Sequence, residues 1–301
     1  MARPWEAEHR VDEALAARLI EAQFPELRPA RLELLGEGWD NVAWLLRGEI
    51  VFRFPRRQIA VELLETERRL LPALALRLPL PIPQPDHVGQ PGDGYPWPFL
   101  GYRRLPGETA CRACLDDRER AAIAAPLARF LAALHAFPVD EARRLGAPPD
   151  RIGRLDLSAK IPELLERMER MRALGYLRDI GPFREILDAG SGLRPSEEVR
   201  LVHGDLYVRH LLIGPGRGLA GVIDWGDLHI GDPAVDLILP HAFLPAGARE
   251  AFREACGDIP EERWQLGRIR AIYSSAAIVV YGHDTGDADL VREGMRVFLG
   301  L

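Results

Sequence analysis

The sequence has almost no lysine and almost no asparagine. Lys160 is the only lysine among 39 basic side chains, and Asn41 is the only asparagine. Any chemistry that proteins usually assign to these two residue types must therefore be done here by other side chains.

Basic charge is not in excess either. The 45 acidic side chains outnumber the basic ones, so the net charge is −6, and no block of clustered Lys and Arg stands out locally. A protein that binds nucleic acid by neutralising its phosphate backbone needs such a block. We therefore do not expect nucleic acid as a partner.

Cysteines and long apolar runs are also scarce. Three cysteines are too few, and odd in number, for a disulfide framework. The longest apolar run, residues 276–281, is far shorter than the ~20 residues that a membrane-spanning helix needs. The N-terminus carries Pro4 and Glu6 where a signal peptide would be apolar. We expect a cytoplasmic protein that has no membrane partner.

Length and composition are those of a folded chain. At about 100–200 residues per domain, 301 residues suggest two domains or one bilobed unit. Apolar residues make up 47% and charged residues 28%, which lie near globular averages and exclude wholesale disorder.

Strand patterns dominate the first hundred residues. Residues 31–35 and 42–46 read as strands joined by a glycine-containing turn, which is typical of a hairpin, and residues 50–54 read as a third strand. Helical spacing of apolar residues predicts helices over 11–22 and 59–76. A further apolar stretch predicts a strand over 97–105.

Helical patterns dominate the rest of the chain. We expect helices over 118–136 and 161–174, a helical tail over 233–300, and two short apolar strands over 199–202 and 219–223. The sequence therefore predicts an α+β fold, with a small β-rich N-lobe over residues 1–105 and a larger helical C-lobe over residues 106–301.

Three polar residues follow the two short apolar strands. Asp205 comes after the first strand, His210 lies five residues on, and Asp224 ends the second strand, 19 residues after Asp205. Kinases space a catalytic aspartate and two metal ligands in this way. We therefore predict that Asp205 accepts the proton of an acceptor hydroxyl, and that His210 and Asp224 hold Mg²⁺ on a nucleotide.

Six motifs extend this pattern across residues 31–240, and with them the chain resembles the aminoglycoside/macrolide phosphotransferase family, the kinase-like antibiotic phosphotransferases related to choline kinase. The motifs are Gly36–Asn41, Val51–Pro55, Gly101–Glu108, His203–Asp205, Ile223–Asp227 and Gly231–Leu237.

The resemblance implies a bilobed protein-kinase-like fold and Mg²⁺-dependent transfer of the γ-phosphate of ATP or GTP. The acceptor is a hydroxyl of a small molecule, for which the family suggests an aminoglycoside or a macrolide antibiotic. The acceptor pocket is expected in the helical lobe. Nothing in the sequence indicates an oligomeric state.

The resemblance also assigns nucleotide contacts. The turn with Gly36 and Gly38 becomes the loop that covers the phosphates. Tyr102 and Arg103 fall in a hinge over residues 101–105, whose backbone groups would bind the purine.

Arg53 stands where a kinase normally has a lysine that grips phosphate. Arginine keeps the positive charge and adds a two-pronged donor. The resemblance pairs it with a helix glutamate, which we expect to be Glu67, with Glu62 and Glu65 as alternatives. A solvated arginine is the other interpretation of Arg53, because half of such a strand faces water.

Five further residues have structural interpretations. We expect His203 to brace the loop that carries Asp205, and Asp232 and Asp236 to accept hydrogen bonds from loop amides. Cys111 and Cys114 lack a second Cys/His pair at zinc-site spacing, so we favour a plain loop there over a metal site.

A catalytically silent nucleotide-binding regulatory module is the rival interpretation. The unusual residues at positions 53 and 210 motivate it. The presence of both Asp205 and Asp224 speaks against it, because a silent protein has little physical need for both.

His210 generates a first test, because most of the family has asparagine at this position. An imidazole offers a metal only a nitrogen lone pair, which suits Mn²⁺ better than Mg²⁺. We expect the wild-type protein to tolerate Mn²⁺ in place of Mg²⁺ better than His210→Asn does, measured as the ratio of phosphotransfer rates in the two metals. Equal ratios in the two proteins would contradict this role for His210.

Overall fold

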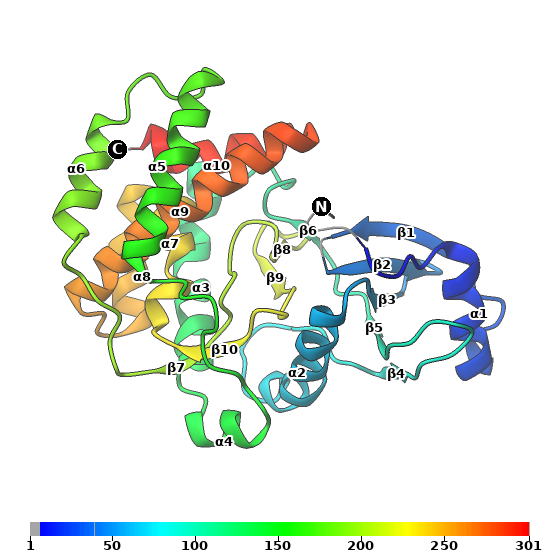
Figure 1. The fold of residues 1–301 in the computed structure, drawn as a ribbon. Coiled ribbons are helices and arrows are strands. Elements are labelled where there is room, and N and C mark those ends of the chain that lie inside the picture. The colour runs from blue at the N-terminus through cyan, green and yellow to red at the C-terminus, as the bar shows by residue number, and fades with distance from the viewer. Residues whose placement is uncertain (1–6, 39, 301) are drawn as a thin grey trace. The chain divides into compact units, whose positions relative to one another are not determined.

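Residue contacts divide the chain into two units. The computed structural model describes residues 7–38 and 40–300, and Figure 1 shows its ribbon. Unit 1 takes in the described residues up to Leu76 together with Pro81–Leu105 and Asp224–Asp227. Unit 2 takes in Arg77–Leu80, Pro106–Ile223 and the described residues from Leu228 onward.

The short segment Asp224–Asp227 joins unit 1, although we expected a single division between residues 105 and 106. Its contacts give the reason. Arg53 of the sheet donates a hydrogen bond of 3.3 Å to Asp224, and Gly226 lies close to the carboxylate of Glu67. The segment that carries one predicted metal ligand therefore packs with the predicted phosphate-binding residues.

Unit 1 is built on a five-stranded antiparallel sheet with the strand order β1-β2-β3-β5-β4. The turn between the first two strands follows a bulge at Gly36, and the predicted hairpin, third strand and last strand are all confirmed. The elements of unit 1 are α1 (Glu13–Gln23), η1 (Pro25–Leu27), β1 (Leu32–Glu37), β2 (Asn41–Leu46), β3 (Ile50–Pro55), α2 (Gln58–Ala75), β4 (His87–Gly89) and β5 (Phe99–Arg103).

Aromatic side chains form much of the core of unit 1. Phe52, Phe54 and Phe99 are fully buried, and the rings of Phe54 and Phe99 stack with their centroids 4.5 Å apart. Leu19 and Ile20 of α1 belong to the same apolar cluster. Aromatic burial of this kind fixes β3 and β5 against each other, and thereby the position of Arg53 between Phe52 and Phe54.

Helix α2 carries a charged residue on its buried face. Ala60, Leu64, Glu67 and Leu71 are buried and follow each other at steps of four, three and four residues, which is the spacing of one helix face. Glutamate is almost never fully buried unless it is paired. The local pattern therefore demands a cationic partner for Glu67.

Unit 2 is mainly helical, with two small antiparallel strand groups, β10-β7 and β6-β8-β9. Its elements are β6 (Glu108–Thr109), α3 (Asp117–His135), α4 (Val139–Arg144), α5 (Leu157–Ala173), α6 (Gly181–Gly190), β7 (Arg200–Val202), β8 (Leu211–Ile213), β9 (Leu219–Val222), β10 (His229–Gly231), η2 (Pro233–Asp236), α7 (Ile238–Ala242), η3 (Ala246–Ala248), α8 (Arg249–Cys256), α9 (Glu261–Thr285) and α10 (Ala288–Leu299).

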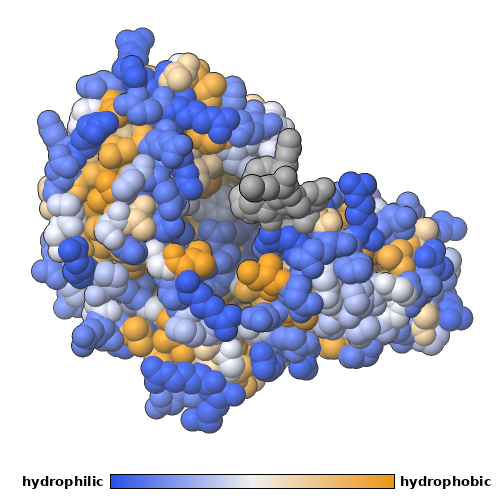
Figure 2. Space-filling model, viewed as in Figure 1, coloured by the Kyte–Doolittle hydropathy of each residue, from blue (hydrophilic) through white to orange (hydrophobic). Residues whose placement is uncertain are grey.

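Helix α9 is the centre of unit 2. Leu266, Ile269, Ile272, Ala276 and Val279 are all buried in one apolar cluster of this unit, and the helix packs against α5, α6, α7 and α10. Figure 2 shows that polar and charged residues cover most of the visible surface, with apolar patches among them. None of the helices in the described part of the chain is long and apolar enough to cross a membrane.

The tail that we predicted as helical is broken into four α-helices. Gly257 and Gly286 have φ values of +94° and +68°, a left-handed conformation that favours glycine and ends α8 and α9. Pro245 and Pro260 stand at the breaks before η3 and α9. Each break corresponds to a glycine or proline in the sequence. The helical pattern continues on both sides of these residues, so the pattern alone does not predict the breaks.

Candidate active site

The loop that carries Asp205 is held by a buried carboxylate. Beyond β7, the backbone N–H groups of His203 and Gly204 donate hydrogen bonds of 2.9 Å each to the two carboxylate oxygens of Asp236. Gly204 has φ of +86°, which glycine adopts without strain. The role that we predicted for Asp236 is confirmed by these contacts.

A histidine completes the surroundings of Asp236. His135, at the end of α3, places its Nε2 atom 3.0 Å from Asp236, whose side chain is fully buried. Burial by itself would raise the pKa of Asp236, but the hydrogen bond from His135 and the loop amides lower it below its usual range. Asp236 is therefore an anion that orders the loop that carries Asp205. Sequence reasoning found no partner for His135.

His203 links two segments of the site, as we predicted for a bracing residue. Its side chain is fully buried, and its Nε2 atom lies 3.2 Å from the carbonyl oxygen of Ile223, the residue before Asp224. Its Nδ1 atom accepts the backbone N–H of Asp205 at 3.4 Å. Since the carbonyl can only accept, the proton of His203 belongs on Nε2.

The predicted metal ligand His210 sits beside Asp205. Its Nδ1 atom lies 2.7 Å from the backbone carbonyl of Asp205 and 3.8 Å from the Asp205 carboxylate. The carbonyl must accept a proton, so Nδ1 carries it and the lone pair resides on Nε2. This tautomer fits a divalent cation. The Asp205 side chain itself is 35% exposed, so it can be reached by an acceptor.

Arg53 and Glu67 form a buried ion pair in unit 1. The Nη1 atom of Arg53 donates to both carboxylate oxygens of Glu67 at 3.0 and 2.8 Å, and Nη2 donates to Asp224 at 3.3 Å. The alternative glutamate Glu65 pairs instead with Arg68 at 2.8 Å. Of the two interpretations of Arg53, the structure therefore excludes the solvated one.

Burial shapes the charges of this pair. Burial alone would lower the pKa of Arg53, but the carboxylates of Glu67 and Asp224 raise it well above its usual range, so the guanidinium stays charged. Burial raises the pKa of Glu67 to about 7, against the lowering effect of Arg53. A cation of fixed charge thus stands beside the predicted metal ligand Asp224.

Tyr102 extends this group in a way that we did not predict. Its side chain lies beside Arg53, and burial raises its pKa to about 12 although Arg53 opposes the shift. We expected the hinge to contribute only its backbone groups, as contacts to the purine. Arg103 is exposed at the end of β5. Spacing along the sequence does not reveal the Tyr102 contact, because it depends on the pairing of Tyr102 with Val51 across the sheet.

The predicted phosphate loop is a tight turn braced by arginines. Gly38 donates its N–H to the carbonyl of Asn41 at 2.9 Å, and Arg56 donates to the carbonyl of Gly38. Arg57 pairs with Asp40 at 2.6 Å. Nothing lies within 4 Å of a Cβ atom placed on Gly36, so the space next to this residue is open.

The metal ligands do not form a protein cage. Among residues 7–38 and 40–300, no three His, Cys, Asp or Glu side chains are grouped to hold a metal ion. Mg²⁺ is commonly held by one or two carboxylates together with substrate phosphates and water. The absence of such a group among these residues is therefore compatible with a metal that phosphates and water help to hold.

The Arg53–Glu67 pair generates a second test. Arg53→Met leaves a carboxylate buried without its partner, so we expect a loss of about 3–5 kcal/mol in the free energy of unfolding. Arg53→Met/Glu67→Met should cost clearly less than the sum of the two single changes, measured by urea unfolding. The half-buried pair Glu65–Arg68 on the same helix is the control, and its removal should cost about 0.5 kcal/mol. Additive effects at positions 53 and 67 would refute the coupling.

Solved structures of antibiotic phosphotransferases share this fold. The GDP complex of wild-type aminoglycoside 2'-phosphotransferase-IIIa is 28% identical with a TM-score of 0.68, and the alignment covers 95% of this chain and 97% of that one. The GDP and kanamycin complex of APH(2")-IIIa is 27% identical with a TM-score of 0.64, and the coverage is 93% and 95%.

A macrolide 2'-phosphotransferase from Brachybacterium faecium is 23% identical with a TM-score of 0.57, over 89% of this chain and 91% of that one, which shows a common fold alone. No curated protein matches the sequence. The sequence does match the model of the phosphotransferase enzyme family over residues 31–271, well over half of the chain. The chain therefore belongs to the phosphotransferase enzyme family.

Proposed function

We propose that Asp205 accepts the proton of an acceptor hydroxyl while the γ-phosphate of ATP or GTP moves to that oxygen. One observation carries this assignment: the Asp205 loop is fixed through Asp236, while the Asp205 side chain stays partly exposed. A base that is held in place before the substrate arrives needs no rearrangement at the moment of transfer.

Arg53 grips the phosphates of the nucleotide in this proposal. Its charge is permanent, and Glu67 holds its guanidinium in one position. The turn of Gly36 and Gly38 covers the phosphates. The segment with Tyr102 and Arg103 offers its backbone to the purine. The GDP complexes of the two aminoglycoside phosphotransferases support a nucleotide as co-substrate.

Asp224 and His210 hold the divalent metal. When bound, the metal neutralises charge on the nucleotide phosphates. Arg53 donates a hydrogen bond to Asp224, so the residue that grips the phosphates in this proposal also contacts a residue that would hold the metal.

The acceptor is a hydroxylated small molecule bound to the helical unit. Aminoglycosides and macrolides are the two acceptor classes that the names of the solved neighbours provide. We assign this chain the same kind of acceptor as those enzymes. Our expectation of a cytoplasmic location rests on the sequence alone.

Asp205→Asn tests the proposed function directly. Removal of the base should lower hydrolysis of ATP or GTP, or transfer to kanamycin or a macrolide, by about 10²–10⁴-fold, measured as release of nucleoside diphosphate. The thermal shift caused by Mg²⁺–nucleotide should stay the same, because the variant keeps the binding groups. Asp258→Asn, at an exposed position between α8 and α9, is the matched control and should keep full activity.

Two results would contradict the proposal. If the Asp205→Asn protein released nucleoside diphosphate at the wild-type rate, Asp205 would not be the base. A wild-type protein that binds nucleotide but neither hydrolyses it nor transfers phosphate would favour the silent regulatory module.

A further inference from the structure

Helices α7, α8 and α9 of unit 2 meet at the buried side chain of His241. Its Nε2 atom lies 3.1 Å from the backbone carbonyl oxygen of Trp264 on α9, and the centroids of the two rings lie 4.2 Å apart. Arg249, the first residue of α8, donates a hydrogen bond of 3.1 Å from Nη2 to the backbone carbonyl of His241 on α7. These contacts place Arg249 beside the point at which the three helices meet.

Three arginines from α8 and α9 surround this point. Arg249 and Arg253 stand four residues apart on α8, so they share one face of that helix. On α9, Trp264 and Arg268 share a face for the same reason. The guanidinium of Arg253 lies 5.0 Å from the ring centre of Trp264, which shows that the two faces pack together. Arg249 and Arg268 therefore belong to one local group of side chains.

The charges of the three arginines act on His241 and on each other. Burial and these charges lower the pKa of His241 to about 3, so its ring is neutral. Burial and the charge of Arg268 also lower the pKa of Arg249. At Arg53, burial has the same effect, but nearby carboxylates outweigh it and raise the pKa. Arg249 and Arg268 thus lie close enough to repel each other, and no anion offsets the repulsion.

Carboxylates near this group serve other side chains. Glu261, at the start of α9, binds Arg253 at 3.2 Å and accepts a hydrogen bond from Gln265 at 2.6 Å. Within residues 7–38 and 40–300, neither Arg249 nor Arg268 forms an ion pair with an aspartate or a glutamate. Neither arginine has an acidic residue three or four positions away along the chain.

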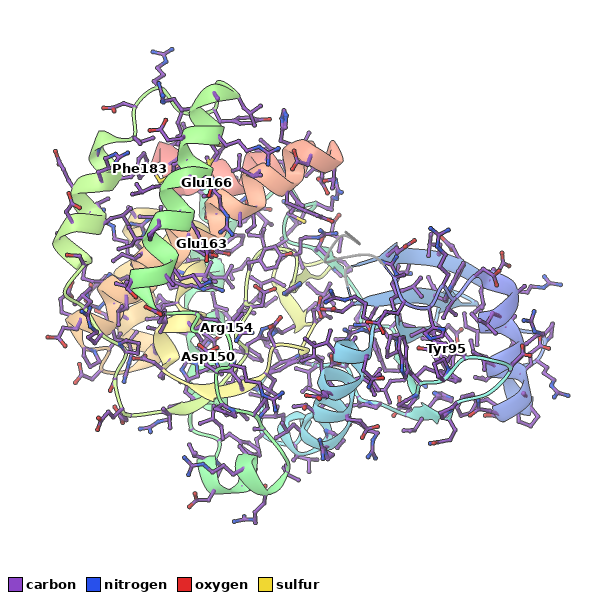
Figure 3. The ribbon with its side chains drawn as sticks, viewed as in Figure 1. Tyr95, Asp150, Arg154, Glu163, Glu166 and Phe183 are labelled. Atoms are coloured by element: carbon purple, nitrogen blue, oxygen red, sulfur yellow. The ribbon has the colours of Figure 1, made fainter. Side chains whose placement is uncertain are left out.

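The acidic residues of α5, which also packs against α9, do not fill this role. Figure 3 labels Glu163 and Glu166 on α5. Glu163 binds Lys160 at 3.2 Å and lies 3.6 Å from Arg167, so its charge is shared by two cations of its own helix. The charges of Arg249 and Arg268 thus stay without a counterion in the described part of the chain.

Arg249 and Arg268 also have unused hydrogen-bond donors. The Nε atom of Arg249 is buried and has no hydrogen-bond partner among the described residues. A buried donor without an acceptor costs free energy, which a suitable acceptor would recover. Arg268 makes no side-chain hydrogen bond within the same part of the chain. Both side chains are half-buried, so each also faces solvent.

We propose that Arg249 and Arg268 bind a phosphate group at the surface of unit 2, where α8 meets α9. Two cations without a counterion match a phosphate monoester, which carries about −1.5 to −2 charges at pH 7 and offers three acceptor oxygens. Arginine suits phosphate because its planar fork presents two donors to two oxygens. The inference goes beyond the proposed function, since neither residue takes part in the proposed transfer of phosphate.

Trp264 provides a local reporter for this site. The sequence has six tryptophans, so incorporation of 5-fluorotryptophan gives six ¹⁹F signals, of which Trp264→Phe lacks the one that belongs to Trp264. The labelled protein is titrated with glycerol 3-phosphate, with inorganic phosphate and with acetate, in the absence of nucleotide and Mg²⁺. A constant ionic strength separates binding from general screening of charge. Acetate, a monoanion, tests whether the charge of the ligand matters.

We expect both phosphates to shift the Trp264 signal to saturation, and acetate to bind about tenfold or more weakly. Arg268→Gln and Arg249→Gln should each raise the Kd for glycerol 3-phosphate about tenfold or more, because each removes a cation and its charged hydrogen bonds. The control Arg144→Gln removes the charge of an exposed arginine on α4 and should leave the Kd unchanged. Thermal unfolding verifies that the three variants are folded.

Vesicles identify the source of the phosphate. Sedimentation with phosphatidylcholine vesicles that contain phosphatidic acid, if it is lost in Arg268→Gln, assigns the phosphate to a lipid headgroup. Binding of glycerol 3-phosphate without such sedimentation assigns it to a soluble molecule.

Three outcomes would overturn the inference: no saturable shift of the Trp264 signal with either phosphate, equal Kd values for the phosphates and acetate, or an unchanged Kd in both folded arginine variants. The titration needs neither nucleotide nor acceptor. A protein that binds phosphate here but transfers none from ATP or GTP would therefore contradict the proposed function and leave this site standing.

Discussion

The arrangement of the loop that carries Asp205 depends on one buried carboxylate. Asp236 accepts hydrogen bonds from the backbone N–H groups of His203 and Gly204, and the ring of His135 contacts the same carboxylate. This buried anion therefore holds the backbone that leads into Asp205. A buried anion is stable only when several donors surround it, and the same donors lose their partner if it is removed. This mutual dependence gives the loop a single conformation. His203 and His210 then fix the backbone on either side of Asp205.

Unit 1 also buries a carboxylate, and there an arginine takes the place of the usual lysine as its partner. A buried glutamate on α2 requires a positive partner, and the partner on β3 is an arginine whose two prongs reach different carboxylates. A lysine ammonium is a compact point charge, whereas the guanidinium is a planar fork that can hold Glu67 while it also contacts Asp224. The arginine at position 53, which first suggested a silent protein, therefore keeps a buried cation paired with a helix glutamate.

Much of this could be predicted from the sequence because the governing signals are local. The alternation of residues in strands, the spacing of apolar residues in helices and the spacing of Asp205, His210 and Asp224 along the sequence can all be read from short stretches of the chain. Other features depend on pairing across the fold. The contact of Tyr102 with Arg53 follows from the sheet register, and the partnership of His135 with Asp236 joins residues 101 positions apart.

The most direct measurement of the central claim is the turnover of Asp236→Asn beside its affinity for Mg²⁺–nucleotide. The amide turns an N–H₂ group toward a backbone donor, which leaves a buried donor without an acceptor at a cost of about 1–3 kcal/mol. If Asp236 orders the loop for catalysis, kcat falls about tenfold or more while the nucleotide Kd stays unchanged in a folded protein. An unchanged kcat in a folded Asp236→Asn protein would contradict the account.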